Sequence, residues 1–413
     1  MDAELIYFFR HALMRDAAYQ LQLPTRRARL HELTLEVMEK LIRTGRLALD
    51  QAAAADLADH AHFAQRARGK KLRDFVALEI LYRNKAATLA ALREDLGAAV
   101  VQLQQIVVHP KCPSRERALA RISLGNRMFR QAQIESARRE LEQALAEARL
   151  QADGTMIATA EIELANIAQA TGNVELARSY FSSALSFALV SANAKLESVA
   201  RGGLAGLDYS AGLPSAEQGF AAALAASERA KDTTNQAIQL QNLGVTMHWL
   251  GREAEGLATL ERAFDLAHSL GRLRLAATIS CNIAHHLEEA GQVAESIQNL
   301  SVAESLARET GAVLIAARAL EIRSRIAQRQ GHLDLAQQQL QEAIAIAVEA
   351  GHLKDLAIHH ARLAIVLNAA GHHAKANEIW ARAASDLLAF GMGTFVKSYQ
   401  QDFEQARGGV VRG

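Results

Sequence analysis

Cysteine and proline are scarce in this 413-residue chain, which has only Cys112, Cys281 and four prolines. Two cysteines so far apart form neither a disulfide framework nor a four-ligand zinc site, so we expect a protein from a reducing compartment. Aromatic residues make up 5% of the sequence, while Ala, Leu, Gln, Glu and Arg dominate it. This composition argues against a β-sandwich or barrel and predicts an all-α protein.

Long apolar runs are also missing. The most hydrophobic stretch, residues 98–108, is interrupted by three glutamines, and no run reaches the 18 or so residues of a membrane-spanning helix. The first residues, Met-Asp-Ala-Glu, carry acid where a secretory signal would carry Lys or Arg. We therefore expect a cytoplasmic protein without a membrane partner.

The chain has little net charge. The 46 Lys and Arg against 45 Asp and Glu give +1, which excludes a globally basic nucleic-acid binder. The residues up to Arg115 hold 18 basic and 13 acidic side chains (18 − 13 = +5), and the remainder holds 28 and 32 (28 − 32 = −4). The arginines of residues 10–29 could contact phosphates, but a solvated helix face explains them equally well. Nucleic acid is therefore not an expected partner.

A phosphate-binding loop is absent. The sequence contains no G-x-x-x-x-G-K-[ST], and Gly69-Lys70-Lys71 lacks both the earlier glycine and the hydroxyl residue. Without backbone amides to hold phosphates and a hydroxyl for magnesium, ATP hydrolysis is not expected. The sequence predicts no cofactor.

A regular glycine spacing is the first positive signal. Glycines recur at a constant interval (271 − 251 = 20) through eight positions, at Gly251, Gly271, Gly291, Gly311, Gly331, Gly351, Gly371 and Gly391. Glycine favours the left-handed conformation just past a helix end. The spacing therefore predicts alternating turns and helices of about 15–17 residues.

The repeating unit is a pair of helices, and its period is therefore twice the glycine interval (291 − 251 = 40). Small residues recur in the first helices and again in the second helices. A large apolar residue precedes nearly all of them, and Arg323 is the exception. A close helix crossing needs a small side chain beside a large one. The first-helix series is Gly125, Ala165, Ala205, Gly244, Ala284, Ser324 and Ala364; the second is Ala144, Ala184, Ala223, Ala263, Ala303, Ala343 and Ala383.

This pattern resembles tetratricopeptide repeats, as Asn242-Leu243-Gly244, Gly251, Leu260 and Ala263 illustrate. The resemblance implies a right-handed α-solenoid of about seven to eight helix-turn-helix units with a short helical head. The period of 40, against about 34 in the family, is similar to that of sensor domains in LuxR-type and maltose-activator-type bacterial regulators. The expected divisions are a head over 1–74, a degenerate first repeat and junction over 75–114, seven repeats over 115–391, and a capping helix and tail over 392–413.

The head carries a second resemblance. Phe8 to Tyr19, with the arginine-rich stretch up to His31, resembles the segment that follows the nucleotide-binding domain in signal-transducing ATPases with numerous domains. There it belongs to a helical, winged-helix-like region. The resemblance implies an alternative role, as a regulatory fragment or subunit of a split ATPase whose nucleotide-binding part lies elsewhere.

Histidine and cysteine patterns give no catalytic or metal site. Adjacent histidines such as His285-His286 point about 100° apart on a helix and do not form the i, i+4 pair of a zinc site, so solvated histidines are expected. Cys281 lies four residues before His285. This spacing fits an activated thiol, but a small buried cysteine is the favoured interpretation.

The concave groove is the best candidate site. In tetratricopeptide arrays the first helices line it, and the resemblance assigns to it a set of polar and aromatic residues that could hold a peptide; simple solvation is the alternative. The two-lysine carboxylate clamp of some relatives is not seen, which argues against recognition of an acidic C-terminus. The assigned residues are Asn126, Asn166, Tyr209, His248, Trp249, His285, Glu288, Arg325, Gln328 and Asn368.

These observations predict a non-catalytic protein-interaction or sensory scaffold in bacterial signalling or transcription regulation. Its expected partner is a protein or peptide, which includes a separate ATPase or regulator.

Overall fold

The computed structural model describes residues 19–66, 73–93 and 95–407, and these form nineteen α-helices without a strand. Most of the head motif from Phe8 to Tyr19 lies outside the described residues. The all-α architecture of antiparallel helix pairs confirms the fold class predicted from the sequence. Two compact units divide the chain, at residues 1–131 and 132–413.

The first unit contains five described helices. Leu35, Leu57 and Phe75 form its apolar core with small alanines between them. Asp50, Asp74 and Asp95 cap three of the helices by accepting hydrogen bonds from backbone N–H groups of the first turn. The helices are α2 (Pro24–Arg43), α3 (Gln51–Ala64), α4 (Phe75–Leu92), α5 (Leu96–Val108) and α6 (Ser114–Arg130).

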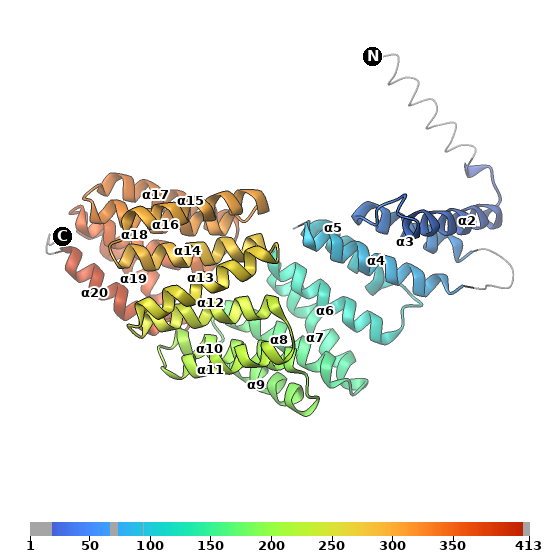
Figure 1. The fold of residues 1–413 in the computed structure, drawn as a ribbon, viewed down its shortest axis with the longest axis horizontal. Helices are drawn as coiled ribbons and strands as arrows, with labels where there is room; N and C mark the ends of the chain where they lie inside the picture. Colours follow the sequence, from blue (N-terminus) through green and yellow to red (C-terminus); the bar gives the residue numbers. More distant parts are fainter. Residues whose placement is uncertain (1–18, 67–72, 94, 408–413) are drawn as a thin grey trace, which may run out of the picture. The chain divides into compact units, whose positions relative to one another are not determined.

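The second unit is a continuous array of fourteen helices (Figure 1). Most of them have 17 residues, which matches the predicted length. The first helices of successive pairs are α8 (Gly154–Ala170), α10 (Ala194–Ser210), α12 (Thr233–Trp249), α14 (Leu273–Glu289), α16 (Val313–Arg329) and α18 (Leu353–Ala369). The second helices are α7 (Ile134–Leu150), α9 (Val174–Val190), α11 (Ser215–Arg229), α13 (Glu253–Ser269), α15 (Val293–Thr310), α17 (Leu333–Glu349) and α19 (His373–Ala389), and α20 (Gly393–Arg407) follows.

The turns follow the predicted rule. All eight glycines of the regularly spaced series have positive φ, between 63° and 82°. Earlier in the array the same turn position is occupied by Gly172 and Gly212, which also have positive φ, and by Ala132, Ala152, Ala192 and Lys231, whose φ values lie between 50° and 59°. The last four adopt the left-handed conformation without the steric freedom of glycine, so the unbroken glycine series begins only at Gly251.

The small and large residues of the repeating pattern form the core. Every alanine of the second-helix series is fully buried, and the apolar residues from Leu141 to Leu340 that precede them are at most 3% exposed. At the α12–α13 crossing, a Cβ added to Gly244 would lie 2.9 Å from the carbonyl oxygen of Gly256. Arg323 replaces the apolar residue of its unit by reaching back to α15, where its Nε lies 2.7 Å from Glu304 Oε1.

The array curves with its first helices on the inside. Each first helix from α8 to α16 contacts the next first helix as well as its own partner, whereas successive second helices of the described array make no comparable contacts with one another. Closer spacing on one side of a stack bends it towards that side. The inward surface of the first helices is called the inner face below.

The array also closes on itself. A Cβ added to Gly172, before α9, would lie 2.2 Å from the carbonyl oxygen of Ala389, before α20. A Cβ added to Gly351, before α18, would lie 3.4 Å from Cβ of Ala132, before α7. Both pairs of turns are eleven helices apart (20 − 9 and 18 − 7). The array therefore completes one superhelical turn in about eleven helices, and its edges touch.

Candidate functional site

A cluster of charged and imidazole side chains lies on the inner face of α12, α14 and α16. Arg325 is its centre: Nη2 donates to Glu289 Oε1 at 2.7 Å, and Nε lies 2.9 Å from Glu288 Oε2. Its Nη1 also donates to Nε2 of His285. We call His248, His285, His286, Glu288, Glu289, Arg325 and Arg329 the inner-face network.

The network ties three successive repeats together. His248 on α12 is 2.5 Å from Glu289 on α14 through Nε2 and Oε2, and the His248 and His286 rings stack at 3.7 Å. On the other side, Arg329 of α16 donates from Nη1 to the backbone carbonyl of Glu288 at 2.6 Å. Because each of these bonds crosses from one repeat to the next, they restrain the side chains of the network.

Burial and neighbouring charges shift the pKa values of the carboxylates and imidazoles in the network. Burial opposes ionisation of Glu289, but the hydrogen bond from His248 and the charge of Arg325 lower its pKa well below the usual range. Burial raises the pKa of Glu288 against the charges of Arg325, Arg329 and Arg362. Burial also lowers the pKa of His286 to about 3, assisted by His248, and it lowers the pKa of His285 well below 6.5. Both histidines are therefore neutral near pH 7.

Three aromatic side chains lie together beside the network. The ring of Tyr209 on α10 meets Trp249 of α12 edge-on at 6.1 Å and Phe395 of α20 at 5.7 Å; we call these three residues the aromatic group. Burial raises the pKa of Tyr209 to about 12. Gly206, one turn before Tyr209, has open space where a side chain would be, since an added Cβ would meet nothing within 4 Å.

Six of the ten residues assigned from the sequence are thus brought together, four in the network and two in the aromatic group. Asn166 lies on α8 and makes a 3.5 Å contact with Glu163, Gln328 is half-buried on α16, and Asn126 belongs to the first unit, where Arg127 donates to its side chain. Asn368 is 1% exposed; its amide donates to the carbonyl of Phe403 and accepts from His373. It anchors α20 and presents no open surface, which corrects its assignment to the groove. Glu288 is 0% exposed, so its side chain, although part of the network, presents no open surface either.

The network includes residues that the sequence interpretation missed. Glu289 follows His285 by four residues and His248 by 41. The spacing from His248 therefore exceeds the 40-residue period by one position. Arg329 follows Arg325 by the same four residues. The i, i+4 spacing on one helix was the available signal.

Two clusters have the composition of metal sites. His248, His285 and Glu289 each offer a ligand atom within 4.8 Å of the others, as do His62, Glu79 and His109 in the first unit. In each cluster an arginine already binds the same carboxylate: Arg325 binds Glu289, and Arg83 binds Glu79 at 2.8 Å. A guanidinium in that position competes directly with a metal cation for the lone pairs, so we assign no metal to either cluster.

Cys281 is fully buried, and burial raises the pKa of its thiol to about 12. A thiol with that pKa is not a nucleophile at neutral pH. This agrees with the interpretation of Cys281 as a small core residue.

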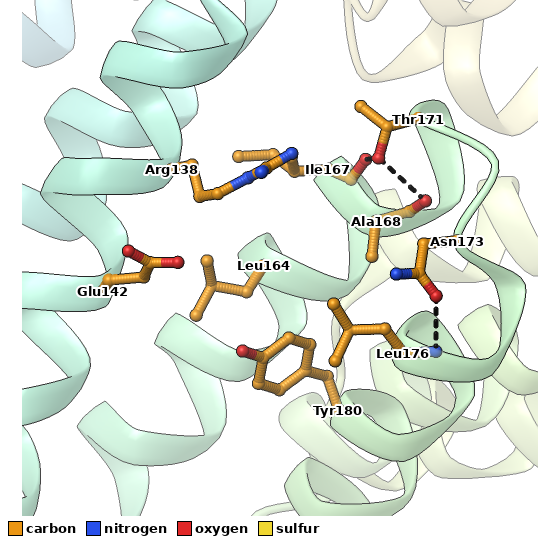
Figure 2. A pocket seen from close by; sticks show the side chains of 9 residues that line it. All are labelled: Arg138, Glu142, Leu164, Ile167, Ala168, Thr171, Asn173, Leu176 and Tyr180. Atoms are coloured by element: carbon orange, nitrogen blue, oxygen red, sulfur yellow. Dashed lines mark hydrogen bonds between the residues drawn. The ribbon is translucent and has the colours of Figure 1, made fainter.

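A separate cavity of about 130 Å³ lies between α7, α8 and α9 (Figure 2). Arg138 and Glu142 of α7 face Leu164 and Tyr180 across it. The cavity shares no residue with the inner-face network and is lined mainly by apolar side chains, as expected for a packing gap between neighbouring repeats. The other residues that line it are Ile167, Ala168, Thr171, Asn173 and Leu176.

Comparison with known proteins identifies the fold. No protein-family model matches the chain, and no curated protein matches it either. Among solved structures, a Rap protein complexed with Competence and Sporulation Factor has a TM-score of 0.61 at 14% identity, covering 92% of this chain and all of that one. The apo quorum sensor NprR from B. thuringiensis has a TM-score of 0.55 at 14% identity, covering 86% and 98% of the two chains.

A third structure, aspartyl phosphate phosphatase F from Bacillus subtilis, has a TM-score of 0.52 at 12% identity over 89% of this chain and 96% of the other. These similarities span nearly the whole of each chain. The protein is therefore a tetratricopeptide-like helical solenoid with the arrangement of helices found in Rap and NprR proteins. Within the part of the chain that the structure describes, no helix is both long and apolar enough to cross a membrane.

Proposed function

We propose that this protein is a non-catalytic regulatory scaffold, active in the bacterial cytoplasm, that binds a peptide or protein partner on the inner face of its repeat array. The observation that carries the proposal is the surface made by the inner-face network and the aromatic group. It combines charged, imidazole and aromatic side chains on four successive first helices, and bonds between repeats hold the network in place. Such a surface loses little conformational entropy when it binds.

The structural neighbours support this role. One of them holds a Rap protein with Competence and Sporulation Factor, and another is described as a quorum sensor. The inner face offers what a peptide requires: side chains that bond its backbone and aromatic rings that receive its side chains. We infer that binding alters the curvature of the array, because the network joins α12, α14 and α16.

Site-specific photocrosslinking tests the proposal. A photoreactive phenylalanine analogue replaces Trp249 on the inner face, and in a matched control it replaces Val348, a residue of α17 that is 60% exposed. We expect a specific crosslinked partner from the native host with the first variant and none with the second. Equal crosslinking at both positions, or none at Trp249, would refute the use of the inner face.

The alternative role, as a subunit of a split signal-transducing ATPase, stays a prediction from the head motif. Its test is co-purification. A P-loop protein that is retained by the full chain and lost when Phe8, Phe9 and Arg10 are replaced by alanine would favour it over the scaffold role.

A further inference from the structure

Three glycines interrupt α10, and packing explains only two of them. A Cβ added to Gly203 would lie 2.4 Å from the Phe181 ring, and one added to Gly202 would lie 2.8 Å from Nε2 of Gln239 on α12. A Cβ added to Gly206 would meet no atom of the described residues within 4 Å. Glycine inside a helix is less stable than alanine, so Gly206 lowers stability without serving a contact in the described chain.

The open position at Gly206 lies between an amide and a set of aromatic rings. Gly202, Gly206 and Tyr209 follow one another at i, i+4 and i+7, so they share one face of α10. The amide of Gln239 lies against the first of them, and the third meets the other two rings of the aromatic group edge-on. We call the face made by Gly202, Gly206 and Tyr209 the glycine strip.

The amide of Gln239 is buried and lacks a hydrogen bond. This residue is 3% exposed, and its Oε1 has no donor among the described residues. Its Oε1 lies 2.9 Å from the position that a Cβ at Gly202 would take, so the amide lies on the bare backbone of the glycine strip. A buried acceptor without a donor is costly. An N–H group of a ligand that lies along the strip would remove this cost.

The length of the glycine strip suits an extended peptide. Seven positions separate Gly202 from Tyr209 (209 − 202 = 7), which corresponds to about 10 Å along a helix. Three residues of extended chain cover about the same distance. Because two side chains are missing, the backbone of a ligand has room to approach the helix closely. A peptide in this position has an aromatic side chain at one end of the strip and a backbone N–H at the other.

We propose that the glycine strip is a subsite for an aromatic residue of the bound peptide. The ring packs over Gly206 against Tyr209 and Trp249, and a backbone N–H about three residues away donates to Oε1 of Gln239. This inference rests on the proposed function and specifies its ligand. Both carboxylates of the inner-face network already lie against Arg325, so selection at this subsite depends on an uncharged ring and on a hydrogen bond.

The test uses the uncharged heptapeptide acetyl-Ala-Ser-Ala-Phe-Ala-Ser-Ala-amide. A second peptide has alanine in place of phenylalanine, and six further peptides each carry one N-methyl group on a different non-aromatic residue. Their affinities for the full chain are measured by saturation-transfer NMR titration. We expect the alanine peptide to bind about tenfold more weakly, because it lacks the buried ring. One N-methyl peptide, modified about three residues from the ring, should bind about fivefold more weakly, because it lacks the donor.

Substitutions at Gly206 separate a binding role from a structural one. Gly206→Ala should raise the midpoint of urea unfolding, because alanine favours the helix and meets no neighbour, and it should weaken binding of the phenylalanine peptide about threefold. Gly206→Leu fills more of the strip and should weaken binding about tenfold or more. Ala225→Leu, at an exposed position of α11, is the matched control and should leave the affinity unchanged. Full affinity in both Gly206 variants would overturn the proposal.

A substitution at Gln239 tests the hydrogen bond. Gln239→Leu should retain the preference for phenylalanine over alanine and abolish the N-methyl effect, since the acceptor is gone; an N-methyl effect that persists would overturn the assignment of Gln239. If all eight peptides bind equally or none binds, while photocrosslinking at Trp249 still captures a partner, the subsite fails and the scaffold function stands. If both experiments fail, the scaffold function fails as well.

Discussion

At the scale of single residues, Phe181 shows how a large side chain fills the space left by a small one. Its side chain is 1% exposed, and a Cβ added to Gly203 on α10 would lie 2.4 Å from its ring. Phe181→Ala should lower the free energy of unfolding by about 3–5 kcal/mol, since it removes a buried ring and leaves a cavity.

Hydrogen exchange measured by mass spectrometry checks which helices lose stability in Phe181→Ala. In a repeat array each unit contacts mainly its neighbours, so amide protection should fall most in α8 to α11. A smaller loss is expected at the turn before α20, which lies against the turn before α9. A uniform loss of protection along residues 132–407 would contradict the repeat model of stability.

His286 gives the protein a pH dependence. Burial, assisted by His248 and Arg318, lowers its pKa to about 3, while the unfolded chain has an ordinary histidine pKa of about 6.5. Below that pH the unfolded state binds a proton that the folded state cannot, so stability falls as the pH drops from about 6.5 towards 3. Each such histidine contributes a slope that approaches about 1.4 kcal/mol per pH unit.

Urea unfolding at pH 7.5 and pH 5.5 measures this effect. Glu289, which bonds to His248, has a lowered pKa, and its contribution is lost only at lower pH. His286→Gln should reduce the difference in stability between the two pH values, and His268→Gln, at an exposed histidine of α13, should leave it unchanged. Equal differences in the two variants would show that His286 does not titrate as described.

At the scale of the helix pair, the residue at the turn affects the stability of the protein through its left-handed backbone conformation. Ala192 has a φ of 50° and is exposed. Its left-handed conformation costs about 1–2 kcal/mol of stability, and no packing of its side chain offsets that cost. Ala192→Gly should raise the free energy of unfolding by about 0.5–1 kcal/mol after the added flexibility of the unfolded chain is counted.

The reverse change supplies the control. Gly251 has a φ of 79° and open space around it, so Gly251→Ala should destabilise by about 1 kcal/mol through the backbone alone. Chemical denaturation of both variants measures the pair. Destabilisation by Ala192→Gly would show that the turn is not strained.

At the scale of the whole array, closure depends on a contact that leaves no room for a side chain. Gly172 and Gly251 have φ values of 80° and 79°, but a Cβ at Gly172 would lie 2.2 Å from the carbonyl oxygen of Ala389. Both Gly172→Ala and Gly251→Ala should lose stability through the left-handed backbone. Gly172→Ala should in addition separate the two edges of the array at this contact.

Distance measurement by pulsed EPR, with spin labels on α9 and α20, checks the opening. We expect a longer or broader distance distribution for Gly172→Ala and an unchanged one for Gly251→Ala. The same distribution in both variants would mean that the closing contact does not hold the edges together.

The all-α class, the lengths of the helices, the positions of the turns and the small and large residues of the core could all be predicted from the amino-acid sequence. These features recur with each helix or each helix pair, and they depend on contacts within one unit or with the next. Ala165, Phe181 and Gly251 could each be assigned because a local rule explains each of them.

The meeting of polar side chains on the inner face and the closure of the array could not be predicted, because both depend on the three-dimensional arrangement of many units. Glu289 reaches His248 from one position outside the 40-residue period. The contact of Gly172 with Ala389 depends on the small rotation between neighbouring units, added over eleven helices. The sequence pattern does not encode that rotation at any one position, and its sum brings Phe395 of α20 against Tyr209 of α10.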